Sequence, residues 1–314
     1  MNKKTWLSSP HLTGEEQKYV KEAFDTNWVA PLGPNVNGLE ADICRYTGAK
    51  ACSALSSGTA ALHLALILLG VEPGDEVICS SFTFSASVNP IRYQQAIPIL
   101  IDSERDTWNM NPELLQEAIE DRIKKGKKPK AIITVHLYGM PSKMDEILEI
   151  GRQYEIPIIE DAAEALGSEY KGKPMGTFGE MGVYSFNGNK IITTSGGGAL
   201  VSNDESFCKK ATFLATQARD SAPHYEHSHI GYNYRMSNIV AGIGRGQMEV
   251  LEERVKSRRH NFELYKKELA GFQNITFLDE PEGFFSNRWL TTILTDSFET
   301  REKIRLALEA ENIE

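Results

Sequence analysis

Cysteine is scarce in this sequence, and its four cysteines lie far apart. Cys44, Cys52, Cys79 and Cys208 include no Cys-x-x-Cys pair. Disulfide frameworks and thiolate zinc sites need numerous or closely spaced cysteines. The sequence therefore predicts neither of these, and we expect reduced thiols in a core.

The sequence also lacks a long apolar run. No stretch approaches the roughly 18 apolar residues that span a membrane. Lys3 and Lys4 near the N-terminus are not followed by the apolar segment of a secretory signal. We therefore expect no membrane partner, and the cytoplasm is the expected compartment.

Positive charge is in short supply as well. Lys and Arg number 34 against 43 Asp and Glu, which gives a formal net charge of -9. A nucleic-acid surface needs clustered Lys and Arg, so no nucleic-acid partner is expected. A local phosphate site stays open, because backbone N–H groups and one lysine can bind an anion whatever the net charge.

Short β-branched runs alternate with amphipathic stretches through most of the chain. The runs predict seven strands, at 51–55, 76–79, 97–101, 131–135, 156–159, 183–186 and 199–201. The intervening stretches predict helices, among them 13–26, 59–69, 112–124 and 143–154. A capping box, Thr13-x-x-Glu16, opens the first of these helices. The alternation predicts an α/β fold with a mostly parallel sheet, which binds ligands beyond the carboxyl ends of its strands.

The pattern changes after about residue 236. A long helical stretch, from about 236 through 250–255 to 269, precedes expected strands at 274–278 and 289–294 and an expected helix at 300–311. A length of 314 residues suits two domains of about 150 residues each. We therefore expect a large domain over 1–250 and a partial, smaller α+β domain over 251–314.

Three strand ends carry residues suited to chemistry. Ser57, Gly58 and Thr59 follow a strand and open a helix, which makes an anion cup, although many helices begin this way without a ligand. Asp161 ends an apolar strand, where a carboxylate is either functional or a helix N-cap. Lys190 lies between a strand and the triplet Gly196-Gly197-Gly198, and a lysine in a desolvated pocket can be a nucleophilic amine.

The order of these segments is more informative than any one of them. An anion cup, the aromatic pair Phe82 and Phe84, an aspartate and then a lysine before glycines supply the contacts that a pyridoxal 5'-phosphate (PLP) ring needs. In this interpretation the cup holds the phosphate, Asp161 pairs with the pyridine nitrogen and Lys190 binds the aldehyde carbon. The chain lacks the Gly-x-Gly-x-x-Gly fingerprint of an NAD-dependent oxidoreductase, the competing class for this alternating pattern.

Six motifs in this order resemble the DegT/DnrJ/EryC1/StrS family of sugar aminotransferases. They are WVAPLG at 28–33, SFTF at 81–84, HLYG at 136–139, EDAAEALGS at 160–168, SFNGNK at 185–190 and GYNYR at 231–235. The resemblance implies the fold type I of PLP-dependent transferases, which is aspartate aminotransferase-like with a mostly parallel seven-stranded sheet. It also implies that the chain continues beyond Glu314, so the small domain is expected to be truncated.

Within the family, the chain is most similar to the enzymes that form UDP-N-acetylbacillosamine. These enzymes move an amino group from glutamate to C4 of a UDP-2-acetamido-2,6-dideoxy-4-keto-hexose in bacterial glycan biosynthesis. This finer resemblance rests on Glu164 and on the run 187–190. Glu164 stands where relatives often have Gln or His near the cofactor ring.

The resemblance also implies roles for individual residues. Lys190 would be the Schiff-base lysine and Asp161 the partner of the ring nitrogen, the two catalytic residues. The cofactor would further contact Ser57, Gly58, Thr59, Phe84, Glu164 and Ser185. Trp28, Val29, Ala30 and Pro31 would border the sugar nucleotide, and Asn233 would enter the active site of the partner subunit of a homodimer.

Two alternatives within the same fold remain open. A sugar dehydratase would usually carry His in place of Lys190, whereas a PLP-binding sensor would keep the cup and Asp161 without transferring nitrogen. His224, His227 and His229 suggest a metal site, but their polar loop offers no recognised ligand set, so no metal is expected.

Overall fold

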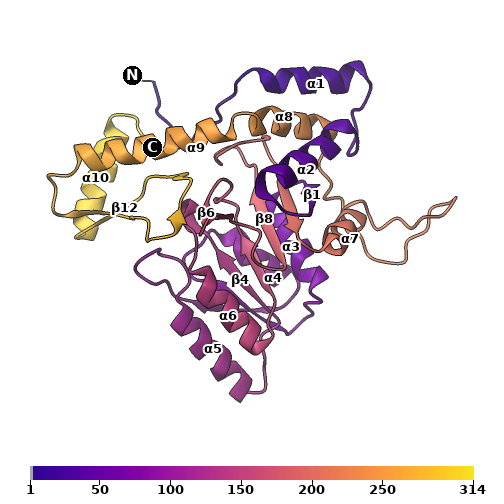
Figure 1. Ribbon diagram of the computed structural model, residues 1–314, viewed down its shortest axis with the longest axis horizontal. Helices are drawn as coiled ribbons and strands as arrows, with labels where there is room; N and C mark the ends of the chain where they lie inside the picture. The colour runs from indigo at the N-terminus through magenta and orange to yellow at the C-terminus, as the bar shows by residue number, and fades with distance from the viewer. Residues whose placement is uncertain (1–2) are drawn as a thin grey trace.

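The computed structural model describes residues 3–314, and its largest element is a seven-stranded sheet with the strand order β1-β9-β8-β5-β4-β2-β3. The strands are β1 (Ala51–Leu55), β2 (Glu76–Ser80), β3 (Ile97–Ile101), β4 (Ala131–Val135), β5 (Ile158–Asp161), β8 (Met181–Ser185) and β9 (Gly198–Ser202). Only β9 runs antiparallel to its neighbours in this sheet, β1 and β8. The predicted α/β fold with a mostly parallel sheet is confirmed (Figure 1).

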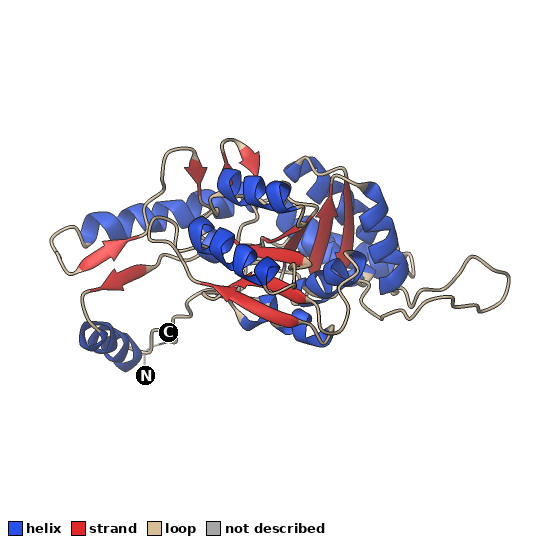
Figure 2. Ribbon diagram, turned by 90° about the horizontal axis from the view of Figure 1, so that it is seen from below, coloured by secondary structure: helices blue, strands red, loops and turns tan. Residues whose placement is uncertain are grey.

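Helices cover both faces of the sheet (Figure 2). On one face lie α3 (Gly58–Leu68), α4 (Asn89–Tyr93) and α7 (Glu205–Ala215), which pack against Cys79, Ile133 and their equivalents on other strands. On the other face lie α2 (Pro34–Thr47), α5 (Pro112–Lys124) and α6 (Met144–Tyr154). Successive strand residues such as Ile78 and Cys79 belong to opposite faces, because side chains alternate along a strand. Both faces are thus buried, as a mostly parallel sheet requires.

Most predicted elements exist, with ends displaced by one or two residues. Strand β5 begins after Pro157, because proline has no N–H to donate to the ladder. Helix α1 (Glu15–Asp25) has Gly14 as its N-cap, so the prediction that Thr13 caps it is wrong. The Glu16 half of the capping box is present, since its carboxylate accepts hydrogen bonds from the backbone N–H groups of Thr13 and Gly14.

The region after residue 250 is built from a long helix and a small sheet. Helix α9 (Leu251–Glu268) leads to the antiparallel pair β10 (Ile275–Phe277) and β12 (Ile293–Thr295), followed by α10 (Phe298–Ala310). The expected strand at 289–294 is wrong over most of its length, because Trp289 lies before β12 and is buried against the main sheet domain.

This region also packs onto the preceding part of the chain. Strand β11 (Phe284–Phe285) pairs with β6 (Glu169–Tyr170), which in turn pairs with β7 (Lys173–Pro174). The two parts therefore pack directly against each other. The domain boundary near residue 250 remains a prediction.

Two further features lie outside the sheet. Helix α8 (Asn238–Met248) lies beside α1, and residues 219–231 form an arm that projects from the body of the molecule (Figure 2). None of the helices that the structure describes is long and apolar enough to cross a membrane.

Candidate active site

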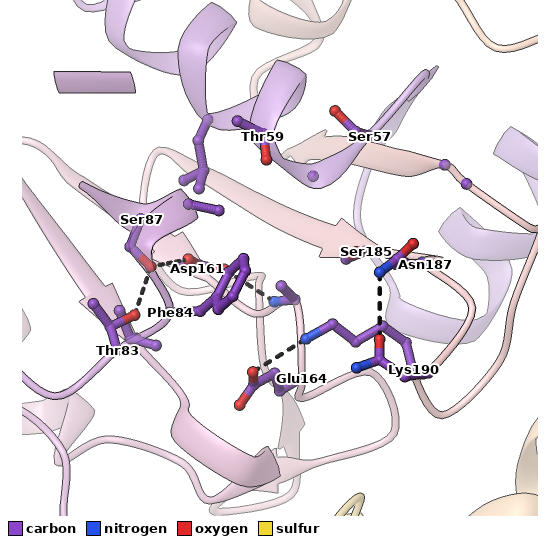
Figure 3. A pocket seen from close by; sticks show the side chains of 18 of the residues that line it. Ser57, Thr59, Thr83, Phe84, Ser87, Asp161, Glu164, Ser185, Asn187 and Lys190 are labelled. Atoms are coloured by element: carbon purple, nitrogen blue, oxygen red, sulfur yellow. Dashed lines mark hydrogen bonds and ion pairs between the residues drawn. The ribbon is translucent and has the colours of Figure 1, made fainter. Parts of the chain in front are cut away.

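A cavity of about 350 Å³ lies at the carboxyl ends of β4, β5 and β8, where their last residues Val135, Asp161 and Ser185 line it. This is the edge at which α/β sheets bind ligands. Predicted cofactor residues gather here, namely Ser57, Gly58, Thr59, Phe84, Asp161, Glu164, Ser185 and Lys190 (Figure 3). Of the residues predicted to contact the cofactor, only Asn233 lies elsewhere.

The first turn of α3 forms one wall of this cavity. Ser57 is the N-cap, and its Oγ accepts a hydrogen bond from the Ala60 N–H at 3.0 Å. The first N–H groups of a helix have no partner within the helix, so those of Gly58 and Thr59 are available to a ligand. Together with the Thr59 hydroxyl and the helix dipole, they suit the phosphate group of a cofactor.

Glycines allow the cup to approach the sheet closely. A Cβ atom on Gly198 would lie 2.4 Å from the backbone nitrogen of Gly58, a distance that no side chain tolerates. A Cβ atom on Gly58 would lie 3.2 Å from the Cβ of Ser185. The glycine triplet noted in the sequence therefore lets β9 pass directly beside the cup, while its first two members, Gly196 and Gly197, line the cavity.

Asp161 forms the opposite wall. The residue is 5% exposed, and its carboxylate accepts hydrogen bonds from the Ser87 hydroxyl at 2.6 Å and the Ala163 N–H at 3.2 Å. The Thr83 hydroxyl lies 2.6 Å from that of Ser87, so a short chain of hydroxyl groups leads to the carboxylate. One oxygen of Asp161 caps a turn and not a helix, and the side chain lines the cavity, so its functional role stays a prediction.

The neighbouring acid, Glu160, has a different role. It is fully buried, and its carboxylate accepts hydrogen bonds from Nε2 of His136 at 3.1 Å and from the N–H groups of Gly176, Phe178 and Gly179 at 2.6–2.8 Å. Adjacent strand residues point to opposite faces. Of the two acids, only Asp161 therefore reaches the cavity.

Lys190 lies between a carboxylate and an aromatic ring. Its Nζ is 3.1 Å from Oε1 of Glu164 and 4.2 Å from the centroid of the Trp289 ring, and the Lys190 side chain is only 12% exposed. The other Glu164 oxygen, Oε2, accepts a hydrogen bond from the Tyr138 N–H at 2.7 Å. Burial, followed by the charge of Glu164, raises the pKa of Tyr138. The amine thus has a fixed anionic partner and a cation–π contact.

Trp289 lines the cavity, although the sequence pattern predicts that it lies in a strand. Its Nε1 donates a hydrogen bond to the carbonyl oxygen of Asn189 at 2.7 Å, and the Ser8 hydroxyl donates to the same oxygen at 2.7 Å. Segments from both ends of the described chain therefore fix the loop that carries Lys190. No local sequence pattern around Trp289 predicts this contact.

The predicted substrate residues lie outside this cavity. Trp28 is 40% exposed and Val29 is 52% exposed, and Asn238 holds their loop through the carbonyl oxygens of Trp28 and Ala30. Pro31 and Asn233 are exposed as well. A single chain does not bring these residues to Lys190.

The histidine-rich arm offers no metal site. Among residues 3–314, no group of three or more His, Cys, Asp or Glu side chains is placed to hold a metal ion. The ring of His229 instead contacts the Ser228 hydroxyl at 2.7 Å.

Comparison with known proteins agrees with the geometry of the cavity. Residues 10–314 match the model of the DegT/DnrJ/EryC1/StrS aminotransferase family. The chain is 55% identical over 314 residues to a Bacillus subtilis (strain 168) protein named "Putative pyridoxal phosphate-dependent aminotransferase EpsN", covering 100% of this chain and 81% of that protein. It is 39% identical over 305 residues to the GDP-perosamine synthase of Escherichia coli O157:H7, covering 97% of this chain and 82% of the synthase.

The fold is likewise that of a solved sugar aminotransferase. The PLP form of the Streptococcus pneumoniae protein named "Putative sugar aminotransferase Spr1654" superposes with a TM-score of 0.90 at 28% identity, covering 99% of this chain and 83% of that chain. The cup, the buried aspartate and the enclosed lysine are the features that such a cofactor needs. This chain belongs to the DegT/DnrJ/EryC1/StrS aminotransferase family and is a PLP-dependent nucleotide-sugar aminotransferase.

Proposed function

We propose that this chain moves an amino group from glutamate to C4 of a UDP-2-acetamido-2,6-dideoxy-4-keto-hexose, in the cytoplasm and as part of bacterial glycan biosynthesis. The observation that carries an amino-transfer function is the enclosed Lys190 amine, which faces the cavity between Glu164 and Trp289. The choice of sugar is supported by the resemblance at Glu164 and at 187–190.

The residues of the cavity fit PLP. The group supplies an aldehyde that exchanges nitrogen and a ring that accepts electrons. Gly58, Thr59 and Ser185 would hold its phosphate, and the exposed Phe84 ring, at the cavity wall, would lie against its flat face.

In the proposed reaction, Lys190 acts twice. Its Nζ is the nucleophile that holds the cofactor, and once released it is the general base that moves a proton from the donor. Because Oε1 of Glu164 is 3.1 Å away, the carboxylate can orient the amine between these tasks.

Asp161 would hold a proton on the ring nitrogen. A buried carboxylate is the usual partner for a buried cation, and the hydrogen bonds from Ser87 and Ala163 keep this one aimed into the cavity. By retaining that proton, Asp161 would suit the ring to accept electrons.

The proposed sugar-nucleotide contacts need a second subunit. Asn233 is exposed, the loop 28–31 is exposed except for the partly buried Ala30, and none of these residues lines the cavity of its own chain. We assign them to the active site of the partner subunit in a homodimer, with Asn233 contacting the cofactor and Trp28, Val29, Ala30 and Pro31 bordering the sugar nucleotide.

A second candidate is a GDP-linked keto sugar, which the 39% identity to a GDP-perosamine synthase supports. To decide, the PLP-loaded protein is incubated with glutamate and either a UDP-linked or a GDP-linked 4-keto-6-deoxy sugar. The 2-oxoglutarate formed and the mass of the sugar product are then measured. We expect turnover with the UDP-linked acetamido sugar. Turnover with the GDP-linked sugar alone would identify the GDP-linked sugar as the substrate. Cofactor binding without turnover of either sugar would favour a PLP-binding sensor.

A further inference from the structure

A second cavity, of about 330 Å³, adjoins the first, and Lys190 lines both. Its walls are the N-terminal segment, residues 190–193 and one side of α9 (Leu251–Glu268). Figure 1 shows the N-terminal segment meeting α9 before it leads into α1. None of the chemistry assigned to the first cavity uses this space.

The lining of the second cavity is cationic. Arg254 and Arg258 line it together with Lys190 and the ring of His11, and the described lining residues include no Asp or Glu. Within residues 3–314, neither arginine has a carboxylate oxygen within 4.0 Å of its guanidinium group. Both arginines are partly buried, and charged side chains are ordinarily paired where they are taken out of water.

Arg254 also has an unused donor. Its Nη1 lies 3.0 Å from Nδ1 of His11, but its Nε is buried with no hydrogen-bond partner. A buried N–H without an acceptor costs free energy, and a planar guanidinium offers two parallel N–H groups to one oxyanion. The second cavity therefore has an N–H donor, Nε of Arg254, for which the described residues of the protein supply no acceptor.

The two arginines lie one helical turn apart and repel each other. Burial, followed by the charge of Arg254, lowers the pKa of Arg258. Like charges at this spacing destabilise a helix. An anion bound between the two guanidinium groups would attract both of them and offset their repulsion.

This cluster is linked to the catalytic loop by hydrogen bonds. Nη2 of Arg258 donates to the Ser8 hydroxyl at 2.8 Å, and Ser8 donates to the carbonyl oxygen of Asn189 at 2.7 Å. Asn189 precedes Lys190, so a ligand that orders Arg258 would also hold the backbone at Lys190.

We propose that the second cavity is a binding site for a small oxyanion, a phosphate or a carboxylate group, held by Arg254 and Arg258. The site is separate from the phosphate cup at Gly58 and Thr59. Its occupation stabilises the contact between the N-terminal segment, α9 and the Lys190 loop.

The test is isothermal titration calorimetry on PLP-saturated protein, so that the cup is already filled. Inorganic phosphate is titrated in one arm and glutarate in the other, with the ionic strength held constant by sodium chloride. We expect saturable binding of one anion per chain, and Arg254→Gln or Arg258→Gln should weaken it at least about tenfold, the loss typical of a charge-assisted hydrogen bond. Binding of only one of the two probes identifies phosphate or carboxylate as the source.

Lys256→Gln is the matched control, because it removes one positive charge from the same helix at an exposed position outside the cavity. Its affinity should equal that of the wild type. If a glutamine variant fails to fold, Arg254→Lys keeps the charge and removes the planar fork, and an intermediate affinity is expected. Absence of saturable binding in the wild type, or equal affinity in the arginine variants and the wild type, overturns the proposal. The visible absorbance of bound PLP is recorded for each variant, which separates loss of this site from failure of the first cavity.

Discussion

Lys190 and Asp161 face the same cavity, but the chain holds them by different means. Asp161 is fixed by Ala163, two residues further on, and by Ser87, which is distant in sequence; both contacts are hydrogen bonds. Lys190 depends on Glu164 and Trp289, which are distant in sequence. The sequence alone indicates both residues, since each follows a strand, but a contact such as that of Trp289 is fixed only by tertiary packing.

Replacement of Lys190 tests the identity of the nucleophile. After borohydride reduction, PLP should be attached to the peptide that contains Lys190, and Lys190→Ala should abolish both this labelling and amino transfer, because no other amine lies at that position. Mass spectrometry of the digested protein and an assay of 2-oxoglutarate provide the measurements. Lys173→Ala, at an exposed lysine, should behave as wild type, and labelling of any other lysine contradicts the assignment.

Replacement of Asp161 tests the proton on the ring nitrogen. Asp161→Ala should still bind some PLP through the cup but lose at least about a hundredfold in turnover. Loss of one buried charge partner costs about 3–5 kcal/mol, and each 1.36 kcal/mol is tenfold in rate. Steady-state kinetics and a PLP titration separate the two effects. Turnover close to wild type would show that the carboxylate only caps a turn.

Burial of Cys208 makes stability depend on pH. Burial raises the pKa of this thiol from 9.0 to about 12. Above pH 9 the unfolded chain loses the proton while the folded chain keeps it, so its contribution is complete below pH 9 and is lost as pH rises towards 12. Between pH 8 and pH 10, the free energy of unfolding in urea should fall by about 1 kcal/mol more in the wild type than in Cys208→Ala, which keeps the other buried thiols. An equal decline in both proteins would assign it to other groups.

At the scale of elements, sequence patterns predict the sheet strands, and the helices at 13–26, 59–69, 112–124 and 143–154, to within two residues of their ends. The seven strands of the sheet lie within two residues of their predicted ends because their apolar runs are short and sharply bounded. The single helical stretch expected from about 236 to 269 is instead two helices, α8 and α9, and α8 forms although Gly242, Gly244 and Gly246 oppose helix formation in isolation. Those glycines allow close packing, as a Cβ atom on Gly246 would lie 2.6 Å from the backbone nitrogen of Glu16.

The turn after β7 depends on Glu160. Glu160→Ala removes the acceptor for three backbone N–H groups and for His136, so the free energy of unfolding should fall by about 3–5 kcal/mol. Urea denaturation measures the change. Glu117→Ala, at an exposed position on α5, is the control and should change stability by less than about 0.5 kcal/mol. A similarly small effect at Glu160 would mean that water replaces its carboxylate.

At the scale of the whole molecule, the proposed dimer follows from what one chain leaves unassembled. The projecting arm ends close to Asn233, and neither it nor the loop 28–31 reaches the cavity of its own chain. Resemblance to a family can suggest residues that act across a subunit interface. Burial and hydrophobic periodicity within one chain do not indicate a contact between two subunits.

Mixed dimers test whether the site is shared. Lys190→Ala and Asn233→Ala proteins should each be impaired, but unfolding and refolding them together should create dimers with one intact site. Activity should then rise towards about a quarter of wild type for random pairing across a two-fold interface. Refolding of each variant alone is the control. If the mixture shows only the average of its parents, Asn233 does not act across an interface.

The positions of the first cavity's lining residues along the chain determine when, during synthesis of the protein, this cavity can form. The lining begins with Ser57 at the N-cap of α3 and ends with Trp289, so most of the described chain lies between these two residues. Synthesis proceeds from the N-terminus, and contacts between distant residues form slowly because long loops must close first. The phosphate cup therefore leaves the ribosome well before the indole ring that encloses Lys190. The chain therefore becomes able to bind the cofactor only late in its synthesis. No short segment of the chain would bind the cofactor if it were transferred to another protein.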